Sequence, residues 1–408
     1  MGGVTARASI SRGMAVAKDG RDADMIGSFD YVIVGAGSAG CVLANRLSAD
    51  PRQRVLLLEG GPTDSYPWIK VPVGYLYCID NPRTDWCYHT VEEVGLGGRA
   101  IGYPRGRGLG GSSSINGMIY MRGQAADYDR WRQAGNVGWG WDDVLPWFLK
   151  SEDHHGGASD MHGAGGELRV ERQRLRWDIL DAFRAAAGQF GVRPIADFNR
   201  GDNEGCAFFE VTQRRGRRWS AADAFLRPAL KRPNLVVRTG ALVDRIELAE
   251  GRVKAIRFGL PGGPCRAEVA GELVLAAGAI GSPAILQRSG IGDLDHLGGL
   301  GVAPVHHLPG VGDNLHDHLQ IRCAWSVTGT TTLNRRAGSW HGKALIGLEY
   351  LLNRSGPMSM APSQLGLFVR SSDRVATADL QYHIQPLSLA AFGGALDPFD
   401  AFTASDCN

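Results

Sequence analysis

The chain has 408 residues, of which 44% are hydrophobic and 21% are charged, so its composition is that of an ordinary globular protein. Its 44 basic residues nearly balance its 42 acidic residues, and the net charge of +2 argues against a dedicated nucleic-acid-binding protein. The seven cysteines include no C-x-x-C pair. This argues against a disulfide framework and a structural zinc site, and it favours a cytoplasmic protein.

The apolar runs of the chain are far too short to span a bilayer, so we expect no integral membrane segment. Residues 1–28 lack the apolar core of a signal peptide. They predict a disordered N-terminal extension, with an organelle transit peptide as the alternative.

The first strong signal lies between Phe29 and Glu59. A β-branched run over 31–34 predicts a buried parallel strand, and a glycine-rich turn follows it. A helical pattern then covers 42–47, and 54–58 predicts a second strand. This strand–turn–helix–strand order is typical of a dinucleotide-binding unit.

The glycines of the turn have the spacing G-x-G-x-x-G, and each has a physical role. Gly35 permits the tight turn, Gly37 lets the backbone approach a pyrophosphate, and Gly40 lets helix and strand pack closely. Glu59 follows Gly40 by 19 residues and is placed to accept hydrogen bonds from ribose hydroxyls. The alternative, a glycine-rich structural turn, is disfavoured because strand, helix and acid are all in place.

A second glycine- and serine-rich loop covers 104–123. Its backbone and hydroxyl donors can wrap a ring system or phosphates. The alternative is a flexible surface linker, which is disfavoured because the loop contains residues that look buried: Ile115, Met118, Ile119, Tyr120 and Met121.

Two polar clusters have a weaker signal. The loop 151–166 contains His154, His155 and His162. Metal ligation is the alternative there, but a solvated loop is favoured because no cysteine or carboxylate spacing supports a metal site. The arginine cluster at 214–218 is likewise predicted to be a solvated loop rather than a site for a phosphate or an acidic partner.

The later elements include a meander of strands attached to one that rejoins the parallel sheet. We expect a glycine-rich turn entering a helix at 309–318, which is a further candidate anion or ring contact. Helices are predicted at 177–190, 220–230, 278–289 and 345–352, with Ser220 as an N-cap. Strands are predicted at 235–238, 241–248, 253–258, 272–276, 320–327 and 378–384.

Together these segments resemble the glucose–methanol–choline oxidoreductase family, which are FAD-dependent alcohol oxidoreductases. The resemblance runs from Phe29 to Asn408 and has the character of the choline and alcohol dehydrogenase branch. The segments that carry it are 81–92, 106–116, 278–292 and 309–318. It implies an α/β fold in which a Rossmann-like FAD-binding domain (29–160 and 213–318) is interleaved with an antiparallel-sheet α+β substrate domain (161–212 and 319–408).

The resemblance also implies which residues contact FAD. The pyrophosphate would meet Gly35, Gly37, Ser38 and Gly40, and Glu59 would hold the adenosine ribose. Val243 lies in the strand whose backbone meets the adenine. Some family members tether flavin through a histidine at the position of Ile115, so we expect non-covalent FAD here. The residues expected along the isoalloxazine and ribityl chain are Gly108, Gly110, Gly111, Ser112, Asn116, Gly117, Met118 and Ile119.

The resemblance places the catalytic histidine, and its histidine or asparagine partner, in a C-terminal segment. That segment follows a strand like 402–405, whereas this chain stops at Asn408. We therefore expect a C-terminally truncated member and name no catalytic residue. His316 and His318 lack a third metal ligand, and packing is favoured for His318 and His383, so no metal site is expected.

The implied reaction is hydride transfer from the CH–OH group of a small alcohol, of choline or primary-alcohol type, to flavin. Electrons would then pass to a quinone, another carrier or oxygen. We expect a cytoplasmic location, with loose association with a membrane carrier as an alternative. Two other functions stay open: a non-catalytic flavin-binding remnant, and an NAD-dependent dehydrogenase, which the first strand–turn–helix–strand unit alone does not exclude.

Overall fold

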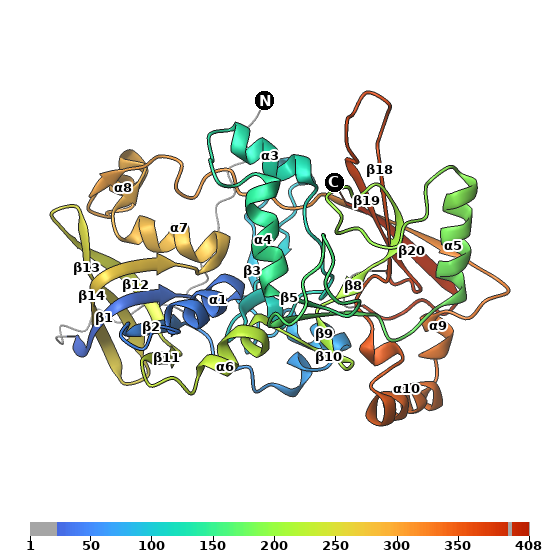
Figure 1. Cartoon of the computed structure of the whole chain (residues 1–408), viewed down its shortest axis with the longest axis horizontal. Coiled ribbons are helices and arrows are strands. Elements are labelled where there is room, and N and C mark those ends of the chain that lie inside the picture. The colour runs from blue at the N-terminus through green and yellow to red at the C-terminus, as the bar shows by residue number, and fades with distance from the viewer. Residues whose placement is uncertain (1–22, 391–393, 408) are drawn as a thin grey trace. The chain divides into compact units, whose positions relative to one another are not determined.

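The computed structural model describes residues 23–390 and 394–407. They form two compact units, and Figure 1 labels many of their elements. Unit 1 contains residues 23–69, 77–116 and 220–316, and unit 2 contains 70–76, 117–219 and the described residues from 317 onward. Both units are discontinuous in sequence. Which of them binds cofactor and which binds substrate stays a prediction, as do the domain boundaries expected at 160, 212 and 318.

Unit 1 is built on a six-stranded sheet in the order β11-β2-β1-β14-β13-β12. Parallel pairing joins β11 to β2, β2 to β1 and β1 to β14, whereas β12, β13 and β14 form an antiparallel meander. The predicted meander joined to the parallel sheet is confirmed. The strands are β1 (Asp24–Val34), β2 (Val55–Glu59), β11 (Leu235–Thr239), β12 (Leu242–Ala249), β13 (Arg252–Leu260) and β14 (Gly263–Leu275).

The centre of this sheet is covered on both faces, as its sequence predicts. Residues 55–58 of β2 are completely buried, because an apolar run in a parallel strand must be shielded on each side. The main helices of unit 1 are α1 (Ser38–Leu47), α7 (Gly278–Arg288) and α8 (Leu294–Gly299). Shorter elements are η1 (Pro67–Ile69), α2 (Tyr75–Cys78), which straddles both units, β3 (Tyr88–His89), η3 (Val94–Leu96), β4 (Gly102–Tyr103), η4 (Gly111–Ser114), η5 (Ala222–Leu226), α6 (Arg227–Ala229), β15 (Ile291–Gly292) and β16 (His306–His307).

Unit 2 contains a five-stranded antiparallel sheet in the order β17-β20-β19-β18-β7 and a three-stranded sheet in the order β5-β6-β8. The larger sheet agrees with the expected antiparallel architecture. Its strands are β7 (Gly205–Phe208), β17 (Gln320–Ser326), β18 (Leu365–Val369), β19 (Leu380–Gln385) and β20 (Ala401–Cys407). The smaller one has β5 (Glu152–His154), β6 (Leu168–Arg172) and β8 (Glu210–Val211). Other elements of unit 2 are η2 (Pro72–Gly74), α3 (Ala125–Gln133), α4 (Trp141–Ser151), α5 (Asp178–Gln189), β9 (Gln213–Arg214), β10 (Arg217–Arg218), α9 (Leu333–Arg336), α10 (Trp340–Asn353) and η6 (Pro357–Ser359).

Two boundary expectations are wrong. Strand β1 begins at Asp24, so the end of the expected extension over 1–28 belongs to the sheet; residues 1–22 lie outside the described residues. The segment 309–318 makes a turn but enters no helix. Gly312 has φ +91° and Asn314 has φ +57°, which are left-handed conformations incompatible with a continuing right-handed helix.

The two polar clusters also differ from expectation. His154 lies in β5 and His155 directly follows it, and the side chains of His154 and His162 are only 10% and 9% exposed, so this is no solvated loop. In the arginine cluster, Arg214, Arg215 and Arg217 are exposed as expected. The cluster nevertheless forms β9 and β10, and Arg218 is buried. The reason is tertiary: neighbouring strands cover side chains that look solvated when the sequence is read alone.

His383 is packed, as expected, and this gives a pH prediction. Burial, with a smaller contribution from His318, lowers its pKa from 6.5 to about 4. Gln381 Nε2 donates to His383 Nε2 over 2.7 Å, and the Phe209 ring lies 5.0 Å away. Because the unfolded chain binds the proton more readily, stability should fall as the pH drops from about 6.5 to about 4.

Urea unfolding between pH 4 and pH 7 tests this expectation. His383→Gln should have a shallower pH dependence than the original chain across that window. His341→Gln, at an exposed position on α10, should keep the original slope. An unchanged slope in His383→Gln would contradict the assignment.

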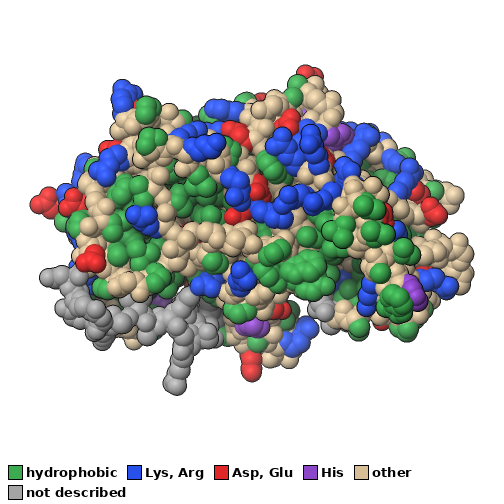
Figure 2. Space-filling view, turned by 90° about the horizontal axis from the view of Figure 1, so that it is seen from below, with side chains coloured by type: hydrophobic (Ala, Val, Ile, Leu, Met, Phe, Trp, Pro, Cys, Tyr) green, Lys and Arg blue, Asp and Glu red, His purple; other side chains and the backbone are tan. Residues whose placement is uncertain are grey.

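No helix among the described residues combines the length and apolar character that a bilayer crossing needs. On the face shown in Figure 2, basic and acidic side chains are interspersed with hydrophobic ones. This mixed surface agrees with the nearly balanced charge of the chain.

Candidate cofactor-binding site

The turn between β1 and α1 requires glycine at two of its predicted positions. Gly35 has φ +98°, and a Cβ there would lie 2.5 Å from the Ala276 carbonyl oxygen. A Cβ on Gly40 would lie 1.8 Å from the carbonyl oxygen of Gly35. The helix therefore starts directly against the strand, as the glycine spacing predicts.

Helix α1 has the properties of an anion-binding terminus. Gly37 is its N-cap, no side chain caps it, and its first turn holds no acidic residue. The backbone N–H groups at the start of the helix and the positive end of its dipole are thus directed at the space before Ser38. A pyrophosphate fits such a terminus.

The second glycine loop lies against the first. Gly110 N–H donates to the Ala36 carbonyl oxygen over 2.8 Å. Gly111 has φ +51°, and a Cβ there would lie 2.7 Å from Gly37 Cα. A side chain at Gly111 would therefore fill the space between the loops, so the glycines form a cradle in which backbone can approach a ligand.

Glu59 connects these loops through its carboxylate. Oε2 accepts from Ala36 N–H at 2.8 Å, and Oε1 accepts from Gly61 N–H at 2.8 Å and from Gly108 N–H at 3.1 Å. Burial raises the pKa of Glu59, while the three backbone hydrogen bonds act in the opposite direction. The carboxylate thus fixes the backbone of the cradle. The sequence predicted a contact of Glu59 with ribose but did not predict this structural role.

Val243 lies near the same end of the sheet. It is a buried residue of β12, and Ala241, just before that strand, donates its N–H to the Glu59 carbonyl oxygen over 2.8 Å. Its predicted adenine contact is therefore compatible with the position of Glu59. The structure thus brings Gly35, Gly37, Glu59 and Val243 together around the carboxyl ends of β1 and β2.

The remaining predicted residues are less closely tied to this cradle. Ser112 is exposed, and its Oγ accepts from Gly106 N–H over 3.1 Å; Asn116 is also exposed. Gly117, Met118 and Ile119 belong to unit 2, so their flavin contact stays a prediction.

Sequence reasoning missed one supporting residue, Ser113. Its Oγ donates to the Gly110 carbonyl oxygen over 2.5 Å and accepts from Ala221 N–H over 3.0 Å. This hydroxyl ties the glycine loop to the segment that begins η5. Only its place in the serine run 112–114 could have suggested the role, because its partner is 108 residues away.

Comparison with known protein families shows to which family this chain and its cradle belong. The sequence model of the glucose–methanol–choline (GMC) oxidoreductase family matches residues 29–320. The chain belongs to the GMC oxidoreductase family. Its GMC relatives include the human protein named "Choline dehydrogenase, mitochondrial", which is 42% identical over 372 residues, covering 90% of this chain and 62% of that protein.

Two further comparisons agree. "Alcohol dehydrogenase [acceptor]" of Pseudomonas putida is 37% identical over 384 residues, covering 93% of this chain and 69% of that protein. The crystal structure of pyridoxine 4-oxidase from "Mesorbium loti" has a TM-score of 0.81 and 31% identity, covering 93% of this chain and 71% of that one. The chain thus spans somewhat under two thirds to about 70% of the length of these GMC proteins.

Proposed function

We propose that this chain forms the flavin-binding framework of an FAD-dependent oxidoreductase that acts on the CH–OH group of an alcohol. The observation that carries the proposal is the cradle of two glycine loops joined by Glu59 in a chain of the GMC family. The fit is physical: Gly37 and Gly111 leave no side chain between the loops, and the α1 terminus is uncapped. Relatives named choline dehydrogenase and alcohol dehydrogenase favour choline or a primary alcohol as substrate.

Several residues of this chain have defined tasks in that proposal. The N-terminus of α1 binds the pyrophosphate, and Glu59 holds both loops in place and orients the ribose. Gly108, Gly110, Gly111 and Ser112 line the ring system through their backbone. Bound FAD supplies the hydride acceptor for alcohol oxidation. We assign no proton-accepting base among the described residues, 23–390 and 394–407, and the position of the catalytic histidine stays a prediction.

The cofactor is proposed to be non-covalent. Ile115, at the position where some relatives carry a tethering histidine, is buried against Ile69 and Cys78 and has no nucleophilic atom. The purified chain should therefore be yellow, and acid precipitation should release all of its flavin into the supernatant. Flavin that stays with the precipitate would contradict this prediction.

The same preparation separates the competing functions. A colourless chain that binds NAD would favour the nicotinamide-dependent alternative. A yellow chain whose flavin is not reduced by choline or primary alcohols under anaerobic conditions would favour the flavin-binding remnant. Alcohol-dependent bleaching of the flavin, followed by reduction of a quinone or dye, would support the full proposal. The electron acceptor and the cytoplasmic or membrane-associated location stay predictions.

A further inference from the structure

The three-stranded sheet of unit 2 brings together two histidines and a glutamate that are far apart in sequence. In the parallel pair β5–β6, His154 is opposite Val170, and in the antiparallel pair β6–β8, Arg172 is opposite Glu210. His155 directly follows β5, and its N–H donates to the Val170 carbonyl oxygen over 3.0 Å. The sheet register therefore brings His154 and Glu210 together, although they are 56 residues apart in the sequence.

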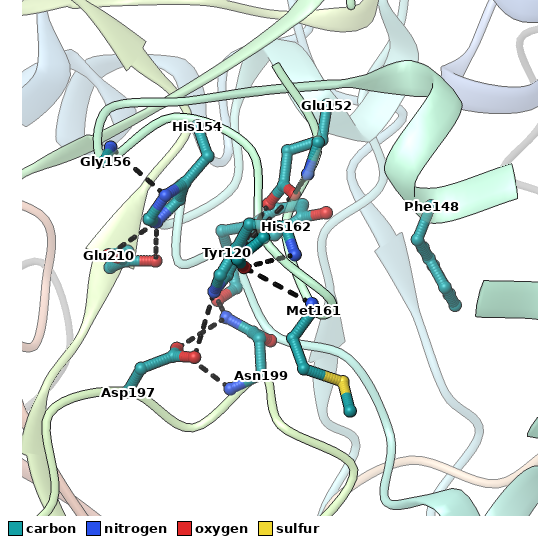
Figure 3. Close-up of polar contacts among 12 residues, drawn as sticks. Tyr120, Phe148, Glu152, His154, Gly156, Met161, His162, Asp197, Asn199 and Glu210 are labelled. Carbon is teal, nitrogen blue, oxygen red and sulfur yellow. Dashed lines mark hydrogen bonds and ion pairs between the residues drawn. The ribbon is translucent and has the colours of Figure 1, made fainter. Parts of the chain in front are cut away.

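The three side chains converge on one carboxylate. His154 Nε2 lies 2.9 Å and 3.1 Å from the two oxygens of Glu210, and His155 Nε2 lies 2.7 Å from Oε1. Figure 3 shows His154 directed at Glu210. The side chains of His154, His155 and Glu210 are 10%, 19% and 11% exposed, so the group is shielded but reachable from solvent.

We propose that His154, His155 and Glu210 form a binding site for a divalent transition-metal ion of the zinc class. Their ligand atoms all lie within 4.8 Å of one another. Ligands about 2.0–2.2 Å from a tetrahedral zinc ion are separated by about 3.3 Å, so these hydrogen-bonded atoms need to open by only a few tenths of an ångström. Two imidazoles and one carboxylate suit zinc, nickel or cobalt, and water can take the remaining position.

His162 supports this group rather than joining it. Its Nδ1 lies 3.2 Å from Glu152 Oε1 and its Nε2 lies 3.0 Å from Asp197 Oδ2, so both ring nitrogens are engaged (Figure 3). Its ring stacks on that of His154 with a centroid distance of 3.8 Å. The stack fixes the orientation of the His154 ring, as an outer-shell residue does in a metal site.

The hydrogen bond from Gly156 indicates which nitrogen of the His154 ring carries the proton, and therefore how metal binding would change that ring. Gly156 N–H donates to His154 Nδ1 over 3.2 Å, so Nε2 carries the ring proton and donates to Glu210 in the metal-free protein. A metal ion at Nε2 replaces that proton, which moves to Nδ1, and the Gly156 N–H then turns away.

Such an ion would tie strand β5 and the residue after it to strand β8. Metal that binds the folded chain but not the unfolded chain raises the midpoint of thermal unfolding. The proposed role is therefore structural and independent of flavin chemistry. It gives a readout that needs neither substrate nor cofactor.

The test uses the full 408-residue chain without an affinity tag, freed of metal by a chelator. Zinc is titrated by calorimetry, and cobalt is followed by its visible absorption. We expect one equivalent to bind, and His155→Ala and Glu210→Gln each to weaken zinc binding at least about tenfold. The control is His307→Ala, in the exposed adjacent pair His306–His307 of β16, which should bind zinc as the original chain does.

Several results would overturn the proposal. One is a chain that takes up no zinc or cobalt; another is a loss of affinity in His307→Ala equal to that in His155→Ala. If the histidine variants fail to fold, X-ray absorption of the zinc-loaded original chain still decides the question. Two imidazole ligands are expected there, and a spectrum with fewer would exclude this site.

Discussion

Gly40→Ala should abolish flavin retention and lower the free energy of unfolding by about 3 kcal/mol or more. The new Cβ would lie 1.8 Å from the carbonyl oxygen of Gly35, a backbone atom that cannot move without opening the turn between β1 and α1. Opening that turn displaces the N-terminus of α1 from the proposed pyrophosphate position. Flavin absorbance per chain and urea unfolding measure the two effects.

The matched control is Gly298→Ala in α8 of the same unit. A Cβ there meets nothing within 4 Å. The change should leave flavin content unaltered and should stabilise the helix by up to about 1 kcal/mol, because alanine has the higher helix propensity. If Gly40→Ala retained flavin as well as this control does, close packing at the turn would not be what the cofactor requires.

Arg122→Met should destabilise unit 2 by about 3–5 kcal/mol. Arg122 and Glu152 have side chains 1% and 0% exposed, and their Nη2 and Oε2 atoms are 2.9 Å apart. Arg122 Nη1 also donates to the Met161 carbonyl oxygen over 2.6 Å. Removing the guanidinium leaves the buried carboxylate of Glu152 without its arginine and the partly buried Met161 carbonyl oxygen without that donor, which costs far more than the lost contact itself.

The control for this variant is Arg130→Met, which breaks an exposed ion pair with Asp127 on α3. Its effect on the free energy of unfolding should stay within about 0.5 kcal/mol, since exposed pairs contribute little. Urea unfolding followed by far-UV circular dichroism compares the two. A loss below about 1 kcal/mol in Arg122→Met would show that Glu152 is adequately neutralised by His162 alone.

The glycine turn between β1 and α1 was predictable because its determinants are local. Gly35 and Gly40 lie within one turn, and the apolar runs around them specify a buried strand on either side of a helix. The meander β12–β14 followed for the same reason, since each of its strands has its own apolar pattern. The prediction of a helix at 309–318 was wrong, because the positive φ values of Gly312 and Asn314 depend on the turn that the chain adopts there.

The strand–turn–helix–strand unit, the glycine positions of the cradle and the family resemblance could thus all be predicted from local patterns in the chain. Which side chains meet, by contrast, depends on the folded arrangement of the whole chain. Glu59 reaches Ala36 and Gly108, which are 23 and 49 residues away, and Glu210 reaches His154 over 56 residues. The physical reason is that strand register and loop packing place these groups, and neither leaves a local pattern in the chain.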